Sequence, residues 1–245
     1  MINLSFLRPS LRFCSPRVAF LFCCCCANIG IAQAQLNIKA GYNLAGFSPA
    51  YTNSVIRAYN ESNRADLVKA MPRLLFMNVV ELGLRYQIED FALEATYFLK
   101  FNPLRATLQP VGQATKSTQS LNFSDNAFSL GATAATPIEW LWAGATLDWA
   151  TVKINSRLST ETTTKTLVNS SQLTSHLFLE FQLGGSSLIR ASLRPYIQIP
   201  WTATEMKALG NALAPNQNLG STRERLINVG IGLVFCNGTD PRENN

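Results

Sequence analysis

Apolar and polar residues alternate with a period of two along most of this chain after residue 35. Between Phe91 and Phe101 the odd-numbered positions are apolar or aromatic, and the even-numbered positions include Glu94, Thr96 and Lys100. Successive side chains of a β-strand point to opposite faces, so this pattern predicts a strand with one apolar and one mostly polar face. The same alternation predicts eight strands, at residues 36–45, 79–88, 91–101, 126–136, 140–151, 172–184, 188–199 and 225–235.

The connections between these strands alternate strictly between short and long. The short ones are Glu89-Asp90, a turn near Thr136-Pro137, and Gly184-Gly185-Ser186-Ser187. The long ones cover about 46–78, 102–125, 152–171 and 200–224. Tilted strands of ~9–11 residues cross a bilayer, and outer-membrane barrels place short turns in the periplasm and long loops outside. We therefore expect an all-β fold, an eight-stranded antiparallel up-and-down transmembrane β-barrel with short periplasmic turns and four long outer loops.

The two faces of the predicted strands differ as a membrane barrel requires. The apolar face carries aromatic residues near both ends, which matches the aromatic girdles of such barrels: Tyr86, Phe91, Phe235, Tyr97, Phe101, Trp149 and Trp201. Charges are costly toward lipid, so the other face should line the lumen as a polar network: Lys39, Glu81, Arg85, Glu94, Lys100, Asp148, His176, Glu180, Arg190 and Arg194. Eight strands enclose about enough space for side chains to fill, which predicts a plugged lumen. Pro195, on the apolar face, predicts a bulge.

The first 34 residues follow the pattern of a secretory signal. Residues 1–17 carry three arginines and no acid, residues 18–31 are mostly apolar, and Ala32-Gln33-Ala34 matches a signal-peptidase site. In a signal peptide, the cysteines of this region serve only as small hydrophobic residues: Cys14 and the run Cys23 to Cys26. Four adjacent cysteines also make a poor metal site, because zinc ligands are usually spaced two to four residues apart. We expect a signal peptide at 1–34, a barrel domain at 35–236 and a periplasmic tail at 237–245.

Removal of the signal changes the charge and the cysteine content. The full chain has 21 Lys and Arg against 15 Asp and Glu, a net charge of +6, and cleavage after Ala34 would lower it to +3. So small an excess gives no reason to expect a nucleic-acid partner. Cys236 would be the one remaining cysteine, which excludes an intramolecular disulfide. No metal-ligand spacing or cofactor motif occurs in the mature chain, so we expect no metal and no cofactor.

Two stretches of the mature chain resemble a known family, and a third resembles the C-terminal signal that the barrel-assembly machinery reads. They are IKAGYNLAGF at 38–47, RAYNES at 57–62 and NVGIGLVF at 228–235. With the strand pattern, they resemble the small outer-membrane β-barrels common in Bacteroidota, over the whole mature chain. The resemblance implies an integral protein of a Gram-negative outer membrane, with outer-membrane lipid and the barrel-assembly machinery as its partners. It also implies an assembly signal with Asn228 as its polar position, Gly230 as its glycine, and Leu233 and Phe235 as its hydrophobic pair.

Two of the long loops have spacing compatible with helices. Val55, Tyr59, Leu67 and Met71 predict one or two short helices over the barrel mouth, and residues 203–213 predict another. The stretch 152–171 is rich in Ser and Thr, which is typical of a flexible loop. Outer loops of barrels often bind partners, but no motif in these loops names an extracellular one.

These features leave three hypotheses for function. A non-enzymatic barrel would be structural, or would bind or adhere through its loops. A lipid-modifying outer-membrane enzyme would use His176, the sole histidine, as a base, but Ser175 points to the opposite face while Glu180 shares the inward face, so no catalytic set converges. A secreted soluble β-barrel would invert the faces and bind a small apolar ligand in an apolar lumen. We favour the first hypothesis and expect no catalytic residue.

Overall fold

The computed structural model describes residues 34–112, 114–185, 189–215 and 217–238 of the 245-residue chain. The expected signal peptide, apart from Ala34, lies outside the described residues together with Cys14 and the run Cys23 to Cys26. Most of the expected tail at 237–245 also lies outside them.

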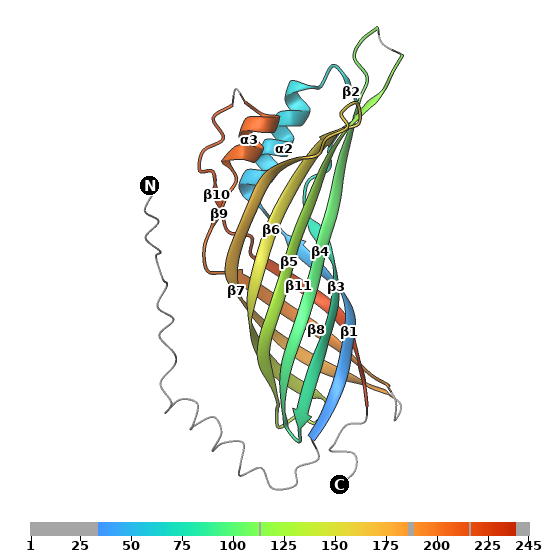
Figure 1. The fold of residues 1–245 in the computed structure, drawn as a ribbon, viewed down its shortest axis with the longest axis vertical. Helices are drawn as coiled ribbons and strands as arrows, with labels where there is room; N and C mark the ends of the chain where they lie inside the picture. The colour runs from blue at the N-terminus through green and yellow to red at the C-terminus, as the bar shows by residue number, and fades with distance from the viewer. Residues whose placement is uncertain (1–33, 113, 186–188, 216, 239–245) are drawn as a thin grey trace, which may run out of the picture. The chain divides into compact units, whose positions relative to one another are not determined.

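Eight antiparallel strands form one closed sheet (Figure 1). They are β1 (Ala34–Phe47), β3 (Phe76–Ile88), β4 (Phe91–Leu108), β5 (Ser117–Ala135), β6 (Leu141–Leu158), β7 (Lys165–Gly185), β8 (Ile189–Pro200) and β11 (Asn228–Asn237). Each of these strands pairs with the next one along the chain. β11 then pairs with β1, from Lys39↔Cys236 to Phe47↔Asn228, which closes the sheet. The predicted eight-stranded up-and-down barrel is therefore confirmed.

The short turns lie at one end of the barrel, which we call the turn end. β3 and β4 are joined by two residues, since Ile88 pairs with Phe91, and Glu89 takes a positive φ of 47° to make the turn. β5 and β6 are joined by residues 136–140, where the Thr136 amide donates to the Leu141 carbonyl at 3.0 Å. The third turn follows Gly184, which has a φ of 92°, and residues 186–188 lie outside the described part of the chain.

Two of the four segments predicted as long loops are mostly strands, so the prediction is wrong there. Most of 102–125 and 152–171 continues the hairpins β4–β5 and β6–β7, which stay paired to Leu108↔Ser117 and Ser156↔Lys165. Alternation persists in these extensions, but its polarity is reversed: inward-facing residues are apolar and buried, while outward-facing residues such as Arg105 and Lys153 are exposed. The prediction required an apolar outward face, and so it ended each strand where the outward face becomes polar.

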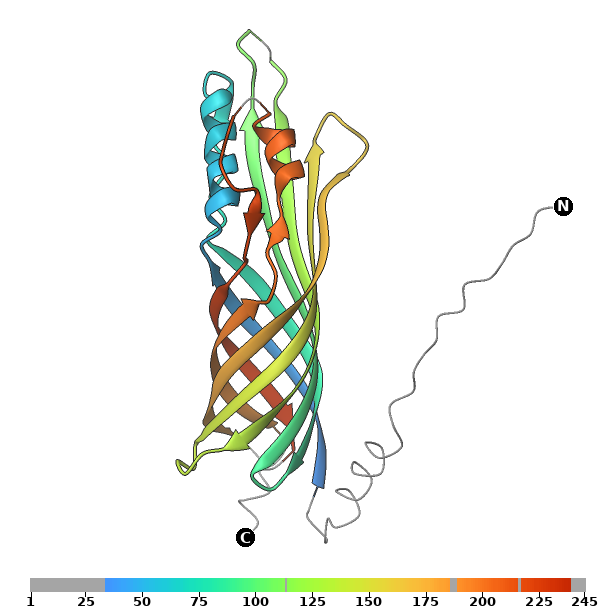
Figure 2. The same ribbon diagram turned by 90° about the vertical axis from the view of Figure 1, so that its left-hand side faces the viewer.

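The other two long connections fold over the opposite end of the barrel, the loop end (Figure 2). The first contains α2 (Ala50–Ser62) and β2 (Leu67–Lys69), which pairs with β4. The second contains β9 (Thr204–Glu205), α3 (Lys207–Leu213) and β10 (Arg223–Glu224). The predicted helices are confirmed, with Val55 and Tyr59 buried on α2, although Leu67 belongs to β2. Among the described residues, no helix is long and apolar enough to cross a membrane.

Pro195 does not produce the predicted bulge. The pairing of β7 with β8 runs from Thr174↔Pro200 to Phe178↔Tyr196 and resumes in the same register at Phe181↔Leu193. Proline lacks an amide hydrogen, so it interrupts the ladder locally without shifting it. The register shift lies nearer the turn end, between Gln182 and Gly184.

The connections and the hairpin extensions form what we call the loop cap, residues 48–75, 102–124, 152–171 and 201–227. Its interior is a hydrophobic core to which both helices and all four extended strands contribute. The core includes Tyr51, Val55, Ile56, Met71, Leu74, Leu104, Leu121, Phe123, Val152, Ile154, Met206 and Leu209. Burial of so many apolar side chains gives the cap the kind of interior that stabilises a soluble domain.

Candidate functional site: the polar lumen and the loop cap

The ten residues expected to form the lumen network all face the barrel interior, and all are buried, with exposed fractions of 8% or less. They come from six of the eight strands, namely β1, β3, β4, β6, β7 and β8, so that only tertiary closure brings them together. Seven of them fall into two hydrogen-bonded layers separated by aromatic rings, while Glu81 accepts from Asn43, Arg190 donates to Gln87, and His176 lies among the rings.

The first layer lies toward the turn end and centres on Glu94. Its carboxylate accepts from Lys39 Nζ at 2.7 Å and from both terminal nitrogens of Arg194 at 2.9 and 3.0 Å. Glu180 accepts from Arg85 Nη1 at 2.8 Å and from Arg194 Nη2 at 2.5 Å. Charge-assisted and bidentate bonds of this kind are among the stronger ones in proteins, so these five side chains form a tightly connected cluster.

The second layer lies toward the loop end and centres on Gln198 and Asp148. The amide of Gln198 donates to Asp148 Oδ2 at 2.9 Å, and Thr174 donates to the same oxygen at 3.1 Å. Lys100 bonds to Gln198 and donates to Asp125 Oδ2 at 2.8 Å. Asp125 was missed in the sequence because it lies in a segment predicted as a loop. Asp125 lies two residues before Ala127, which faces inward, and residues two apart in a strand share a face, so the sequence did indicate that Asp125 faces inward.

The buried charges of the lumen balance once Asp125 is included. Five cations face five carboxylates, namely Lys39, Arg85, Lys100, Arg190 and Arg194 against Glu81, Glu94, Asp125, Asp148 and Glu180. Removing charges from water costs several kcal/mol per ion, and only close pairing of opposite charges offsets this. An equal number of each sign, with Lys39, Arg85, Lys100 and Arg194 each within 3 Å of a carboxylate oxygen, is what a packed polar plug requires.

His176 lies between the two layers and is surrounded by rings. Its ring centroid is 4.6 Å from that of Tyr196, 5.4 Å from that of Phe98 and 5.6 Å from that of Phe178. Its Nδ1 is 3.8 Å from Asp148 Oδ2. Ser175 is on the outer face, where its hydroxyl accepts from the Trp201 indole at 2.8 Å. The structure therefore separates this histidine from the adjacent serine.

The residues of the expected assembly signal lie on both faces of β11. Asn228 is buried and donates to Gln198 Oε1 at 2.9 Å. Gly230 faces inward against the Tyr196 ring, and a Cβ there would overlap with the ring. Leu233 and Phe235 are exposed on the outer surface. Cys236 faces inward and is the one free cysteine within the described residues.

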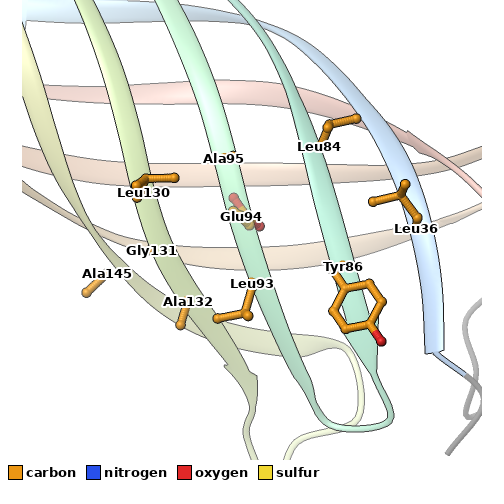
Figure 3. A pocket seen from close by; sticks show the side chains of 10 residues that line it. All are labelled: Leu36, Leu84, Tyr86, Leu93, Glu94, Ala95, Leu130, Gly131, Ala132 and Ala145. Carbon is orange, nitrogen blue, oxygen red and sulfur yellow. The ribbon is translucent and has the colours of Figure 1, made fainter. Parts of the chain in front are cut away.

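The outer surface of the barrel is apolar. In the described strands, no outward-facing residue between the turn end and the level of Phe101, Trp149 and Trp201 is charged. A hollow of about 620 Å³ in this surface is lined by Leu36, Leu84, Tyr86, Leu93 and Leu130 around the small residues Ala95, Ala132 and Ala145 (Figure 3). Glu94 approaches the hollow from behind, but its carboxylate belongs to the lumen cluster. The hollow therefore offers hydrocarbon contacts and no reactive group.

The two ends of the barrel differ in charge. The loop cap contains twelve Lys and Arg residues and five Asp and Glu residues, a net charge of +7. The turn-end segments 89–90 and 136–140 contain three acids and no base. Among the described residues of the cap, the one ion pair is the exposed contact between Arg223 and Glu205, at 3.6 Å. The cap is thus a basic surface whose cations are largely available to solvent and ligands.

A buried glutamate holds α2 in place within this basic cap. The N-cap residue Pro49 makes no side-chain cap bond. Instead, Glu224 of β10 accepts from the Tyr51 amide at 2.7 Å, from the Thr52 amide at 3.2 Å and from the Thr52 hydroxyl at 2.7 Å. A negative charge at a helix N-terminus is favourable, so Glu224 links the last connection of the chain to the first.

Within the described residues, no group of three or more His, Cys, Asp or Glu side chains is arranged to hold a metal ion.

No protein-family model matches the sequence, and no curated protein matches it. Among solved structures, the chain is similar to the crystal structure of Ail, the attachment invasion locus protein of Yersinia pestis, in complex with the heparin analogue sucrose octasulfate. The two are 10% identical, with a TM-score of 0.43, over 83% of this chain and 97% of Ail. The fold assignment rests on the strand pairing described above.

Proposed function

We propose that the protein is an integral outer-membrane β-barrel with a plugged polar lumen, and that it has a structural role or binds partners through its loop cap. In this proposal a cleaved signal peptide exports the chain, the barrel-assembly machinery inserts it, and outer-membrane lipid surrounds it. The observation that carries the proposal is the distribution of charge, with ten charged side chains buried inside the barrel and none on the outer face of its apolar band.

The outer surface is difficult to reconcile with water. Leu36 and Ile38 are exposed by 65% and 63%, and large apolar side chains of every strand of the barrel are exposed in the same way. Monomeric soluble proteins rarely expose a continuous apolar patch of more than a few hundred Å². In a bilayer the same surface is favourable, and the closed sheet leaves no unpaired strand edge facing lipid.

The alternative of a secreted soluble barrel with an apolar ligand site predicted an apolar lumen. The described lumen contains paired charges and hydrogen-bonded amides, which contradicts that prediction. The lipid-modifying enzyme remains the second hypothesis from the sequence, but the placement of Ser175 outside the barrel and of Glu180 in the arginine cluster gives His176 no catalytic set to join. We therefore favour a non-enzymatic role.

Cell fractionation and gel mobility test the proposal. We expect a mature-size band in the outer-membrane fraction that migrates differently in detergent gels before and after boiling, because a closed barrel resists the detergent until it is heated. A soluble protein in the periplasm or medium, with the same mobility in both samples, would contradict the membrane assignment.

A pair of outward-facing substitutions tests which surface contacts lipid. Leu84→Lys puts a charge within the apolar band and should reduce folding into vesicles by about 2–4 kcal/mol, because a cation near the bilayer midplane is costly. Thr151→Lys is the matched control, since Thr151 lies on the outer face of β6 just beyond Trp149, where the surface becomes polar. Equal folding yields for both variants would indicate that the band does not face lipid.

A further inference from the structure

One hollow of the loop cap is lined by three arginines. It measures about 520 Å³ and lies between α2 and the segment that follows β2, and we call it the arginine groove. Its lining consists of Ile56, Arg57, Asn60, Glu61, Arg64, Met71, Pro72 and Arg73. Arg57 lies on α2, Arg64 lies two residues after the end of this helix, and Arg73 comes from the segment after β2. The groove thus exists only because two separate parts of the first connection lie side by side.

Two asparagines of α2 fix these two parts relative to each other. Asn60 donates to the Met71 carbonyl and accepts from the Met71 amide, both at 2.9 Å. Asn53 makes the same pair of bonds with Leu74, at 3.2 and 2.8 Å. Ile56 and Met71 are buried beneath the groove. The backbone that carries the arginines is therefore held in place before any ligand binds, which lowers the entropic cost of binding.

The arginines themselves are exposed and have no acidic partner within the described residues, as none of them lies within ion-pairing distance of a carboxylate. Glu61 is the single acid of the lining, so the groove has a net charge of +2, within a cap of net charge +7. Guanidinium groups present a planar set of donors that suits phosphate oxygens in a bidentate geometry. Three of them around one hollow suit a ligand with more than one phosphate group.

We propose that the arginine groove binds phosphate groups of a phosphorylated saccharide. The inference rests on the proposed outer-membrane location, which places the cap among surface glycans. Arg57 and the end of α2 lie roughly 10 and 20 Å along the helix axis from Ala50, at 1.5 Å per residue. Since α2 runs along the long axis of the barrel at its loop end (Figure 2), these distances place the groove beyond the apolar band, at the level of sugars attached to the membrane rather than of the lipid phosphates at its surface. Pro72 is the exposed apolar residue of the lining and provides a contact for a sugar ring.

Binding is measured on the full barrel folded in zwitterionic detergent. The probe is a phosphorylated oligosaccharide from the core of lipopolysaccharide, and the same oligosaccharide after enzymatic removal of phosphate is the control ligand. We expect the protein to bind the first and not the second. A charge-assisted bond contributes enough for about a tenfold loss of affinity per arginine, so R57Q/R64Q/R73Q should bind at least 100-fold more weakly.

The matched control is R105Q/K153Q/K165Q, which removes the same charge from exposed cap positions outside the groove. Its affinity should stay within about threefold of the wild-type value. Equal losses in both triple variants would show that the overall field of the cap, and no particular groove, attracts the anion, and would overturn the proposal. Equal binding of the dephosphorylated sugar would overturn it as well.

The mobility of each sample on unboiled gels is recorded together with its affinity. A folded barrel that fails to bind contradicts the groove alone, whereas a chain without a heat-dependent shift contradicts the outer-membrane proposal. Phosphatidylcholine vesicles with and without whole lipopolysaccharide identify the source of the phosphate. If added lipopolysaccharide blocks the soluble probe, the protein's own membrane supplies the ligand, and if it does not, the ligand is a free or foreign glycan.

Discussion

Gly210 of α3 lies against the Tyr51 hydroxyl of α2 at the point where the two helices of the cap meet. Burial raises the pKa of Tyr51, and the nearby carboxylates of Glu205 and Glu224 raise it further, so the hydroxyl is neutral at physiological pH. The Tyr51 amide is one of the donors to Glu224. Tyr51 therefore connects the contact between α2 and α3 to the hydrogen bonds that Glu224 accepts at the N-terminus of α2. A small change at Gly210 should affect both.

We predict that Gly210→Ala destabilises the cap. In an exposed helix this change would stabilise by up to about 1 kcal/mol, but here the new Cβ would overlap with the Tyr51 hydroxyl, which reverses the sign. Hydrogen exchange at the amides of Tyr51 and Thr52 should become faster. Tyr51→Phe in the same chain removes the overlapping oxygen and should restore much of the protection. Unchanged exchange in Gly210→Ala would contradict the packing described here.

At the scale of the elements, the two faces of the long hairpins β4–β5 and β6–β7 exchange polarity between the barrel and the loop cap. Within the barrel they place polar side chains inside and apolar side chains outside, and in the cap they do the reverse. Strand pairing is continuous through this change of polarity on β4–β5, and it shifts by one residue on β6–β7 between Ile154 and Asn155. Each hairpin therefore connects the membrane-facing part rigidly to a cap with its own hydrophobic core.

Neighbouring substitutions on β6 test this arrangement. Ile154→Ala should destabilise the cap by about 3 kcal/mol, because Ile154 is fully buried in its core. Lys153→Ala changes an exposed residue on the opposite face and should have an effect below about 0.5 kcal/mol. Limited proteolysis should cut the cap of the first variant faster, while both variants retain the unboiled mobility of a folded barrel. A loss of that mobility in Ile154→Ala would show that cap and barrel do not unfold separately.

At the scale of the whole molecule, the balanced charges of the lumen decide whether the barrel is a plug or a pore. Glu94 contacts Lys39 and Arg194 directly, and its Oε1 is 3.6 Å from Arg85 Nη1. The same cations also contact other carboxylates of the lumen: Lys39 is close to Glu81, and Arg85 and Arg194 pair with Glu180. Removal of one carboxylate would leave buried positive charge without compensation.

We predict that Glu94→Gln lowers the free energy of unfolding by roughly 3–5 kcal/mol, the usual effect of breaking a buried ion pair from one side. Urea unfolding of the barrel in vesicles measures it. The double variant K39M/E94Q removes one charge of each sign and should recover a large part of the loss. If Glu94→Gln is as stable as the wild type, water screens the lumen charges, and ion conductance across planar bilayers should then be detectable.

Local alternation was enough to predict the strands, their faces and the inward placement of the charged residues, because the direction of a side chain from a strand depends only on its position in the chain. Lys39, Arg85 and Glu94 were recognised on this basis. Asp125 and the hairpin extensions were missed for a physical reason: the surroundings of the outer face change from lipid-like to aqueous at that level, and the expected polarity changes with them.

The sequence by itself thus determined an eight-stranded barrel with an apolar exterior and a charged interior, because both follow from a period of two and from the number of segments. Only the tertiary structure decided which charges meet, since Arg194 and Glu94 are 100 residues apart and their contact depends on closure and register. The same holds for the arginine groove, where Arg73 and Arg57 line one hollow because Asn60 binds the backbone of Met71. Contacts between distant segments depend on the whole closed sheet, and no local pattern encodes them.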